Sequence, residues 1–140
     1  MTFLTVEDQI IFHEGEKLKP YKCGADKLSI GIGRNLDDNG ISKEESRLMF
    51  KNDMAAVRAD LIRVFGDTWK SFTEGRKRAF IDLRFNLGPN RFRGFNRLIR
   101  AAKNEQWDMA AYELTDSLWW RQVQSDRRNL LYHQLKTGEI

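Results

Sequence analysis

The sequence is poor in residues that could cross-link it. Among 140 residues it holds one cysteine, Cys23, and two histidines. A single cysteine cannot form a disulfide within the chain, and it excludes a zinc site built on several thiolates. His13 and His133 have no partner at metal-ligand spacing. We therefore expect neither a metal nor a cofactor.

Long apolar runs are also missing. No segment approaches the roughly 18 apolar residues that a membrane span requires. Residues 1–17 lack the basic and then apolar pattern of a secretion signal. We expect no stable membrane insertion, and synthesis and retention in the cytoplasm, so that release would need another protein. With 41% hydrophobic and 31% charged residues, the composition is typical of one soluble globular domain.

Acidic residues are scarce in one stretch. Between Arg76 and Arg100 there are eight lysines or arginines and a single acid, Asp82. The whole chain carries a net charge of +4. Such a patch suits a polyanion, which could be nucleic acid, anionic lipid or a bacterial envelope. Because no helix-turn-helix, zinc or single-strand-binding signature accompanies the patch, we expect no nucleic-acid partner.

The N-terminal third contains the β-like part of the chain. Thr5 is a capping residue for a short helix that ends at Gly15. Residues 16–21, which include Pro20, are predicted as a loop, and residues 22–27 as a tight reversal. Residues 28–33 alternate with period two, as a half-buried strand does, and residues 37–40 are predicted as a second turn. These signals predict a small β hairpin or three-stranded sheet.

The rest of the chain is predicted to be helical. Ser42 and Glu45 form a capping box that begins a long amphipathic helix. Further helices are predicted over 73–87, 95–103, 107–115 and 125–136. The fold class is therefore α+β and mostly helical, in a single domain over 1–140. We assign a β-containing lobe to about 16–42 and a helical lobe to about 60–140, which also includes the N-terminal helix 5–14.

Two motifs suggest sites but are incomplete. Gly31-Ile32-Gly33 lacks the third glycine and the following helix of a dinucleotide-binding loop. The sequence from Asp37 to Gly40 has calcium-like composition without the remaining ligands of a loop site. Neither motif predicts a binding site.

Glu14 is a stronger candidate. It stands in the last turn of the first helix, where the negative end of the helix dipole disfavours the ionised carboxylate. A carboxyl group kept protonated in this way suits general acid catalysis. Most glutamates at such positions are only solvated, so position alone leaves the role open.

The residues around Glu14 resemble the active-site region of the phage lysozymes or endolysins, which form glycoside hydrolase family 24. The family signature is Glu, eight residues, Asp or Cys, five residues and Thr. Glu14, Cys23 and Ser29 have this spacing, and Ile-Gly-x-Gly follows at 30–33. Ser29 keeps the hydroxyl of the usual threonine. Arg34 replaces a common histidine, so an ion pair at that position cannot be taken over from relatives.

The resemblance continues along nearly all of the chain. It includes residues 78–88 of the central helix, residues 94–95 and 107–111, Ser117, Trp119 and Gln122, and residues 127 and 137–138 near the C-terminus. It implies a lysozyme-like fold with two lobes joined by the long helix. It also implies that Phe85 and Asn86 bind the sugar chain, and that Arg127 pairs with the catalytic glutamate. Arg128 is the alternative, because the alignment can slip by one residue there.

The resemblance implies hydrolysis of the β-1,4 bond between N-acetylmuramic acid and N-acetylglucosamine in peptidoglycan, with Glu14 as the general acid. Cys23 could orient a water, deprotonate it or attack the anomeric carbon, and Ser29 would hold the water or the thiol. The family favours water attack with inversion. If Cys23 were only a packing residue, Asp26 is another group that could position the water.

Host-cell lysis by a monomeric endolysin is the expected role. The enzyme would reside in the host cytoplasm and reach the periplasm and cell wall after a membrane-permeabilising helper, a holin, acts. The alternatives are a tail-associated lysozyme module of a phage particle and a peptidoglycan-binding domain that has lost catalysis. Turnover of purified wall separates an enzyme from a binding domain.

Overall fold

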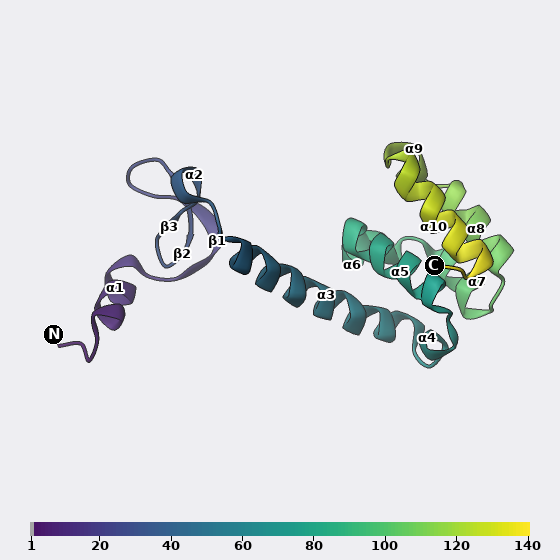
Figure 1. Ribbon diagram of the computed structural model, residues 1–140, viewed down its shortest axis with the longest axis horizontal. Helices are drawn as coiled ribbons and strands as arrows, with labels where there is room; N and C mark the ends of the chain where they lie inside the picture. The colour runs from purple at the N-terminus through teal and green to yellow at the C-terminus, as the bar shows by residue number, and fades with distance from the viewer. Residues whose placement is uncertain (1) are drawn as a thin grey trace. The chain divides into compact units, whose positions relative to one another are not determined.

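A computed structural model describes residues 2–140 and divides the chain into two compact units, which meet in sequence between Met49 and Phe50 (Figure 1). The first unit contains a three-stranded sheet and two short helices, and the second is entirely helical. Helix α3 (Lys43–Phe65) begins in the first unit and ends in the second. The predicted α+β, mostly helical fold class is confirmed.

The first unit follows the local signals of the sequence. Helix α1 (Val6–Glu14) is capped by Thr5, whose hydroxyl accepts a hydrogen bond from the Asp8 amide at 3.0 Å. The helix ends at Gly15, where φ is +72°. The sheet has the order β1-β2-β3, with strands β1 (Lys17–Lys22), β2 (Leu28–Gly31) and β3 (Arg34–Asn35). Both pairings are antiparallel.

Two predictions for this unit were wrong in detail. The segment predicted as a loop over 16–21 is mostly strand β1. An edge strand tolerates Pro20 because one side of it has no ladder partner, and the register is irregular between Lys17 and Tyr21. The turn predicted over 37–40 is the one-turn helix α2 (Leu36–Asn39), whose first turn is capped by the Asn35 side chain.

An ion pair links the third strand to the start of the long helix. The Arg34 guanidinium donates to both carboxylate oxygens of Glu45 at 2.8 Å and to the Gly40 carbonyl at 3.1 Å. Glu45 also accepts from the Ser42 amide, and its own amide donates to the Ser42 hydroxyl, as the predicted capping box requires. These bonds, first of all the one from Arg34, lower the pKa of Glu45 to about 2.

We expect Glu45→Gln to lower the melting temperature slightly at pH 7, since both partners are partly exposed. A carboxyl group with a lowered folded-state pKa stabilises the fold above its unfolded-state pKa of about 4.3, and this stability is lost as the pH falls toward 2. The difference between wild type and variant should therefore shrink over that range. Melting curves from pH 7 to pH 2 test this. Glu44→Gln is the matched control, and a difference that did not shrink would contradict the assignment.

The second unit consists of the rest of α3 and seven further helices. The four longer ones are α5 (Glu74–Leu87), α7 (Asn96–Lys103), α8 (Trp107–Thr115) and α10 (Ser125–Thr137), close to the predicted ranges. Three short helices were not predicted: α4 (Thr68–Ser71), α6 (Pro89–Arg93) and α9 (Leu118–Gln122). Hydrophobic periodicity cannot identify a helix of four or five residues.

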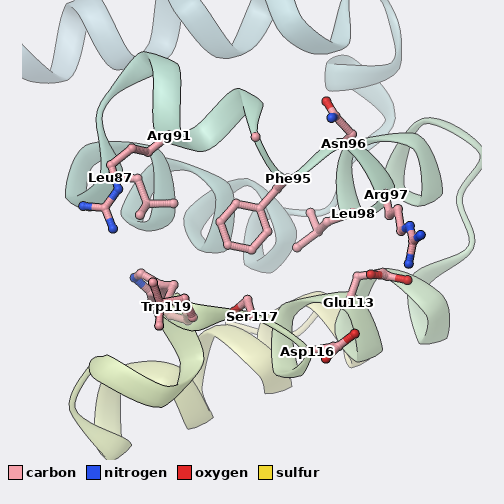
Figure 2. A pocket seen from close by; sticks show the side chains of 12 residues that line it. Leu87, Arg91, Phe95, Asn96, Arg97, Leu98, Glu113, Asp116, Ser117 and Trp119 are labelled. Atoms are coloured by element: carbon pink, nitrogen blue, oxygen red, sulfur yellow. The ribbon is translucent and has the colours of Figure 1, made fainter.

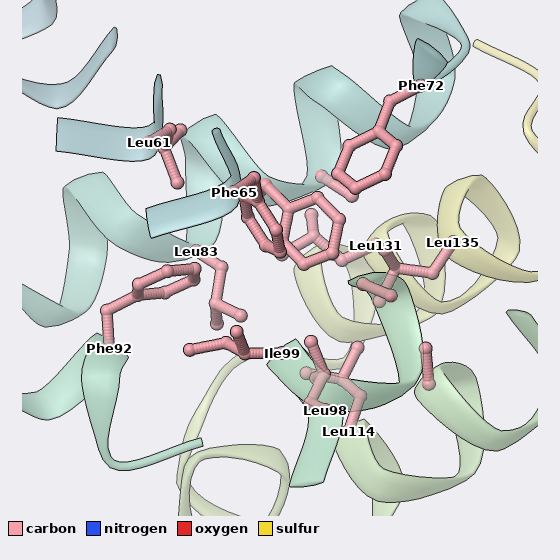
Figure 3. Packing of buried hydrophobic residues seen from close by; sticks show 14 of the residues in the cluster. Leu61, Phe65, Phe72, Leu83, Phe92, Leu98, Ile99, Leu114, Leu131 and Leu135 are labelled. Carbon is pink, nitrogen blue, oxygen red and sulfur yellow. The ribbon is translucent and has the colours of Figure 1, made fainter. Parts of the chain in front are cut away.

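Aromatic and leucine side chains form one core in this unit (Figure 3). Phe65 packs between Phe80, Phe72 and Trp69, with ring centroids 4.7 to 5.9 Å apart. Leucines from five helices surround these rings. The fully buried ones are Leu61, Leu83, Leu98, Leu114, Leu131 and Leu135. Their burial fixes α5 among its neighbours, and α5 carries two of the predicted substrate-binding residues.

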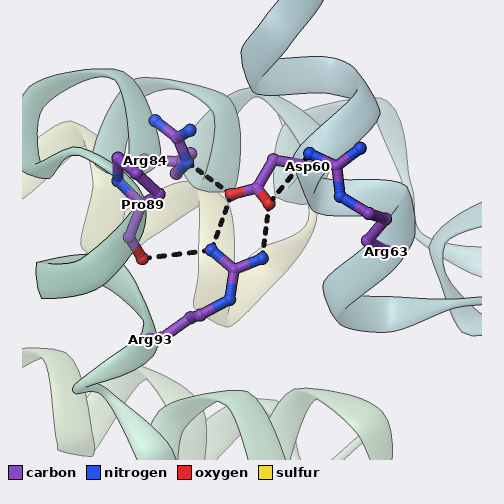
Figure 4. A network of polar contacts seen from close by, with 5 residues as sticks. All are labelled: Asp60, Arg63, Arg84, Pro89 and Arg93. Atoms are coloured by element: carbon purple, nitrogen blue, oxygen red, sulfur yellow. Dashed lines mark hydrogen bonds and ion pairs between the residues drawn. The ribbon is translucent and has the colours of Figure 1, made fainter.

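A buried carboxylate ties α3 to α5 and α6 (Figure 4). Asp60 is 3% exposed and accepts hydrogen bonds from Arg84 at 2.7 Å and from Arg93 at 2.9 Å, while the second Arg93 nitrogen bonds its other oxygen. Arg63 approaches the same carboxylate at 3.4 Å. The pKa of Asp60 is held well below its usual range, chiefly by Arg93. The paired charge keeps a buried acid ionised and connects three helices.

Candidate active site

Glu14 lies against the turn between β2 and β3. Lys17, three residues beyond Glu14, pairs with Gly31 in the antiparallel sheet, and Gly33 follows in the turn after β2. The Glu14 carboxylate approaches Gly33 so closely that a methyl group on Gly33 would stand 2.5 Å from Glu14 Oε2. The side chain is exposed within its unit. Thus the helix end and the strand pairing together determine where the predicted acid lies.

Cys23 stands at the opposite end of β2, in the reversal that follows β1. Its amide donates to the Lys27 carbonyl at 2.9 Å, and the Asp26 amide donates to the Cys23 carbonyl at 2.9 Å. The pKa of the thiol lies below its usual value, first because of the Lys27 backbone amide and then because of that of Ala25. The Ser29 hydroxyl contributes in the same direction. The turn therefore favours the thiolate, the form that acts as a base or nucleophile.

Ser29 is the most buried polar residue beside the thiol. It is 2% exposed in β2, and its hydroxyl donates to the Lys27 carbonyl at 3.3 Å. Cys23 is half-buried, and Asp26 is exposed at the tip of the same turn, with φ of +61°. The Ser29 hydroxyl lies within hydrogen-bonding reach of the Cys23 thiol, and the roles of the two residues in a reaction stay predictions.

Phe85 and Arg127 line one pocket of the second unit. This pocket has a volume of about 840 Å³ and is lined by α3, α4, α5 and α10. Arg127 forms an ion pair with Asp82 on α5, with nitrogen–oxygen distances of 2.6 and 2.7 Å. Phe85 is 41% exposed and meets Phe50 edge to face. An aromatic face and a fixed guanidinium therefore share one concave surface.

Asn86, the next residue on α5, has a different partner. Its Oδ1 accepts a hydrogen bond from Trp119 Nε1 at 2.8 Å. Because indole is a donor only, this bond determines which end of the amide faces Trp119 and leaves the amide nitrogen as a donor to other groups. Asn86 is exposed and Trp119 is buried.

Trp119 also lines a second pocket of about 530 Å³ (Figure 2). Arg91 and Phe95 lie on the wall formed by the α5–α7 region, and Glu113 and Asp116 lie on the facing wall with Trp119. Charged side chains of both signs and one aromatic ring on each wall, Phe95 and Trp119, therefore line this pocket.

The two candidate arginines are held differently. Arg127 has Asp82 as a carboxylate partner. Arg128 donates to the Trp120 carbonyl at 2.9 Å and stacks over the Trp120 ring, with its carbon 5.2 Å from the ring centroid. The predicted pairing of Arg127 with Glu14 stays a prediction. The sequence analysis did not identify Asp82 as the partner of Arg127. The excess of basic residues around this single acid was the signal that could have indicated an ion pair there.

Over residues 2–140, no three histidine, cysteine or acidic side chains lie close enough together to hold a metal ion. In the same range, no helix is long and apolar enough to cross a bilayer. A carboxyl group such as that of Glu14 is able to transfer a proton, and a thiol such as that of Cys23 is able to act as a nucleophile. The catalytic roles of these two residues stay predictions.

Most of this chain is similar in sequence to known proteins. The sequence pattern of the family described as Phage lysozyme matches residues 12–133. Two proteins of Dictyostelium discoideum, named "Probable T4-type lysozyme 1" and "Probable T4-type lysozyme 2", are each 24% identical over 164 residues, which cover 97% of this chain and 96% of theirs. The pre-baseplate central spike protein Gp5 of Enterobacteria phage T4 is 28% identical over 100 residues, which cover 69% of this chain and 17% of the spike protein.

Proposed function

Because the chain belongs to the phage lysozyme family, we propose that it is a muramidase that hydrolyses the β-1,4 bond between N-acetylmuramic acid and N-acetylglucosamine in bacterial peptidoglycan. The observation that carries the proposal is the Glu14, Cys23 and Ser29 spacing inside the matched region, on one small sheet and its flanking helix. Membership of the family supports a peptidoglycan hydrolase of the lysozyme type.

In the proposed reaction, Glu14 protonates the glycosidic oxygen as the bond breaks. A water attacks the anomeric carbon from the opposite face, oriented by Cys23, with Ser29 holding the thiol. The product then has inverted configuration. The lowered pKa of Cys23 supports a role for its thiolate in accepting the proton of that water.

Phe85, Asn86 and Arg127 are the proposed substrate-binding residues. Phe85 offers an exposed ring face, against which the apolar face of a sugar can pack. The free Asn86 amide nitrogen can donate to a hydroxyl or acetamido oxygen of the glycan. Arg127, held by Asp82, can donate to carbonyl or carboxylate oxygens.

The products of digestion test the proposed bond. We expect mass spectrometry of digested wall to find muropeptides with a reducing N-acetylmuramic acid end. Products with 1,6-anhydro sugars would instead identify a transglycosylase, and free peptides would identify an amidase or peptidase. Wall incubated with Glu14→Gln protein is the control. Binding without any product would favour a domain that has lost catalysis.

Lysis of the host cell is the proposed biological role. A monomer that accumulates in the host cytoplasm would reach the periplasm and wall once a holin permeabilises the membrane. The similarity to part of a phage pre-baseplate central spike protein favours one alternative, a tail-associated wall-cutting module. Mass spectrometry of purified phage particles separates the two roles, because only the tail module would be found in the particle.

A further inference from the structure

Gly33 lies so close to the Glu14 carboxylate that a side chain at position 33 would overlap it. A methyl group added at its Cα would stand 2.5 Å from Glu14 Oε2, 2.9 Å from Cδ and 3.2 Å from Cγ. Carbon and oxygen atoms that are not bonded do not approach to 2.5 Å without a shift. The Glu14 carboxylate therefore occupies the space that a side chain at position 33 would need.

Nearby glycines make this observation specific. Gly31 has φ of +67° and Gly33 has φ of +66°, so both occupy the left-handed region that favours glycine. A methyl group on Gly31 would meet no atom within 4 Å. Backbone conformation thus explains a glycine at both positions, whereas contact with Glu14 distinguishes Gly33 alone.

We propose that Gly33 is a positioning residue for the reaction: its missing side chain lets the Glu14 carboxylate rest on the turn between β2 and β3, in the place where it protonates the glycosidic oxygen. The inference rests on the proposed function of Glu14. A side chain at position 33 meets the flexible end of a glutamate, so the carboxylate moves away while the fold tolerates the change. A displacement of about 1 Å at a reacting group can lower the rate by about 100-fold.

The experiment compares Gly33→Ala with Gly31→Ala. The two variants impose the same left-handed conformation on alanine and should lower the melting temperature by similar amounts. We expect Gly33→Ala to lower kcat on soluble peptidoglycan fragments by at least about tenfold more than Gly31→Ala does, with little change in KM. Equal losses of kcat in the two variants, or loss of folding in Gly33→Ala alone, would overturn the proposal.

A double-variant cycle tests whether Gly33 acts through Glu14. Glu14→Asp shortens the acid by one methylene and withdraws its carboxyl group from position 33. We expect Gly33→Ala to reduce kcat by a smaller factor in the Glu14→Asp background than in the wild type. The same factor in both backgrounds would contradict the proposed mechanism. Full activity of Glu14→Gln would contradict the proposed function itself. If Glu14→Gln is inactive but Gly33→Ala and Gly31→Ala lose kcat equally, only this inference is contradicted.

Discussion

Glu14→Gln is expected to fold like the wild type and to lose about 100- to 10,000-fold of its wall-cutting rate, the usual loss when a general acid is removed. Glutamine has nearly the same shape as glutamate, so the contact with Gly33 and the end of α1 should persist. It cannot, however, donate a proton to the leaving oxygen. Turbidity loss of Gram-negative cells with permeabilised outer membranes measures the rate, and thermal melting checks the fold.

Glu16→Gln is the matched control for this result. Glu16 is another exposed acid just beyond Gly15, and it has no proposed role in the reaction. We expect it to retain wild-type turnover. A correctly folded Glu14→Gln protein with near-native turnover would remove the central assignment of the proposed mechanism.

Cys23→Ala and Cys23→Asp are expected to differ sharply in activity. The alanine variant should lose at least about 100-fold, because no group then orients or deprotonates the attacking water. Its melting temperature should change little, since Cys23 is only half-buried and its removal leaves no large cavity. The aspartate variant should lose about tenfold or less, because a carboxylate can also orient a water.

A packing role for Cys23 predicts the reverse order. Alanine would then be tolerated, and aspartate would destabilise the fold by placing an unpaired charge in the turn. Lysis rates and melting temperatures of the two variants separate the readings. A thiol-directed reagent provides an independent measurement: it should inactivate the wild-type enzyme, and bound chitooligosaccharide should slow the modification. If Cys23→Ala is fully active, Asp26 becomes the candidate that positions the water.

The local parts of the site could be predicted from the sequence. Glu14, Cys23 and Ser29 lie within sixteen consecutive residues, where a capping signal, a reversal and an alternating pattern determine the chain path. Each of these signals depends on neighbours a few residues away. Strand β1 escaped prediction because Pro20 is normally read as a loop signal, and only its edge position in the sheet made it acceptable.

The fold class, the long helices and the spacing of the candidate catalytic residues could all be derived from the sequence, because short-range patterns encode them. Which distant groups meet depends on the tertiary packing. Asp82 pairs with Arg127, 45 residues away, and Asp60 pairs with Arg93, 33 residues away. The chain holds 24 basic and 20 acidic residues, so charge alone allows many pairings and leaves these partners open. Packing of the helices around the aromatic core selects one arrangement, and a buried carboxylate is stable only where that packing supplies its donors.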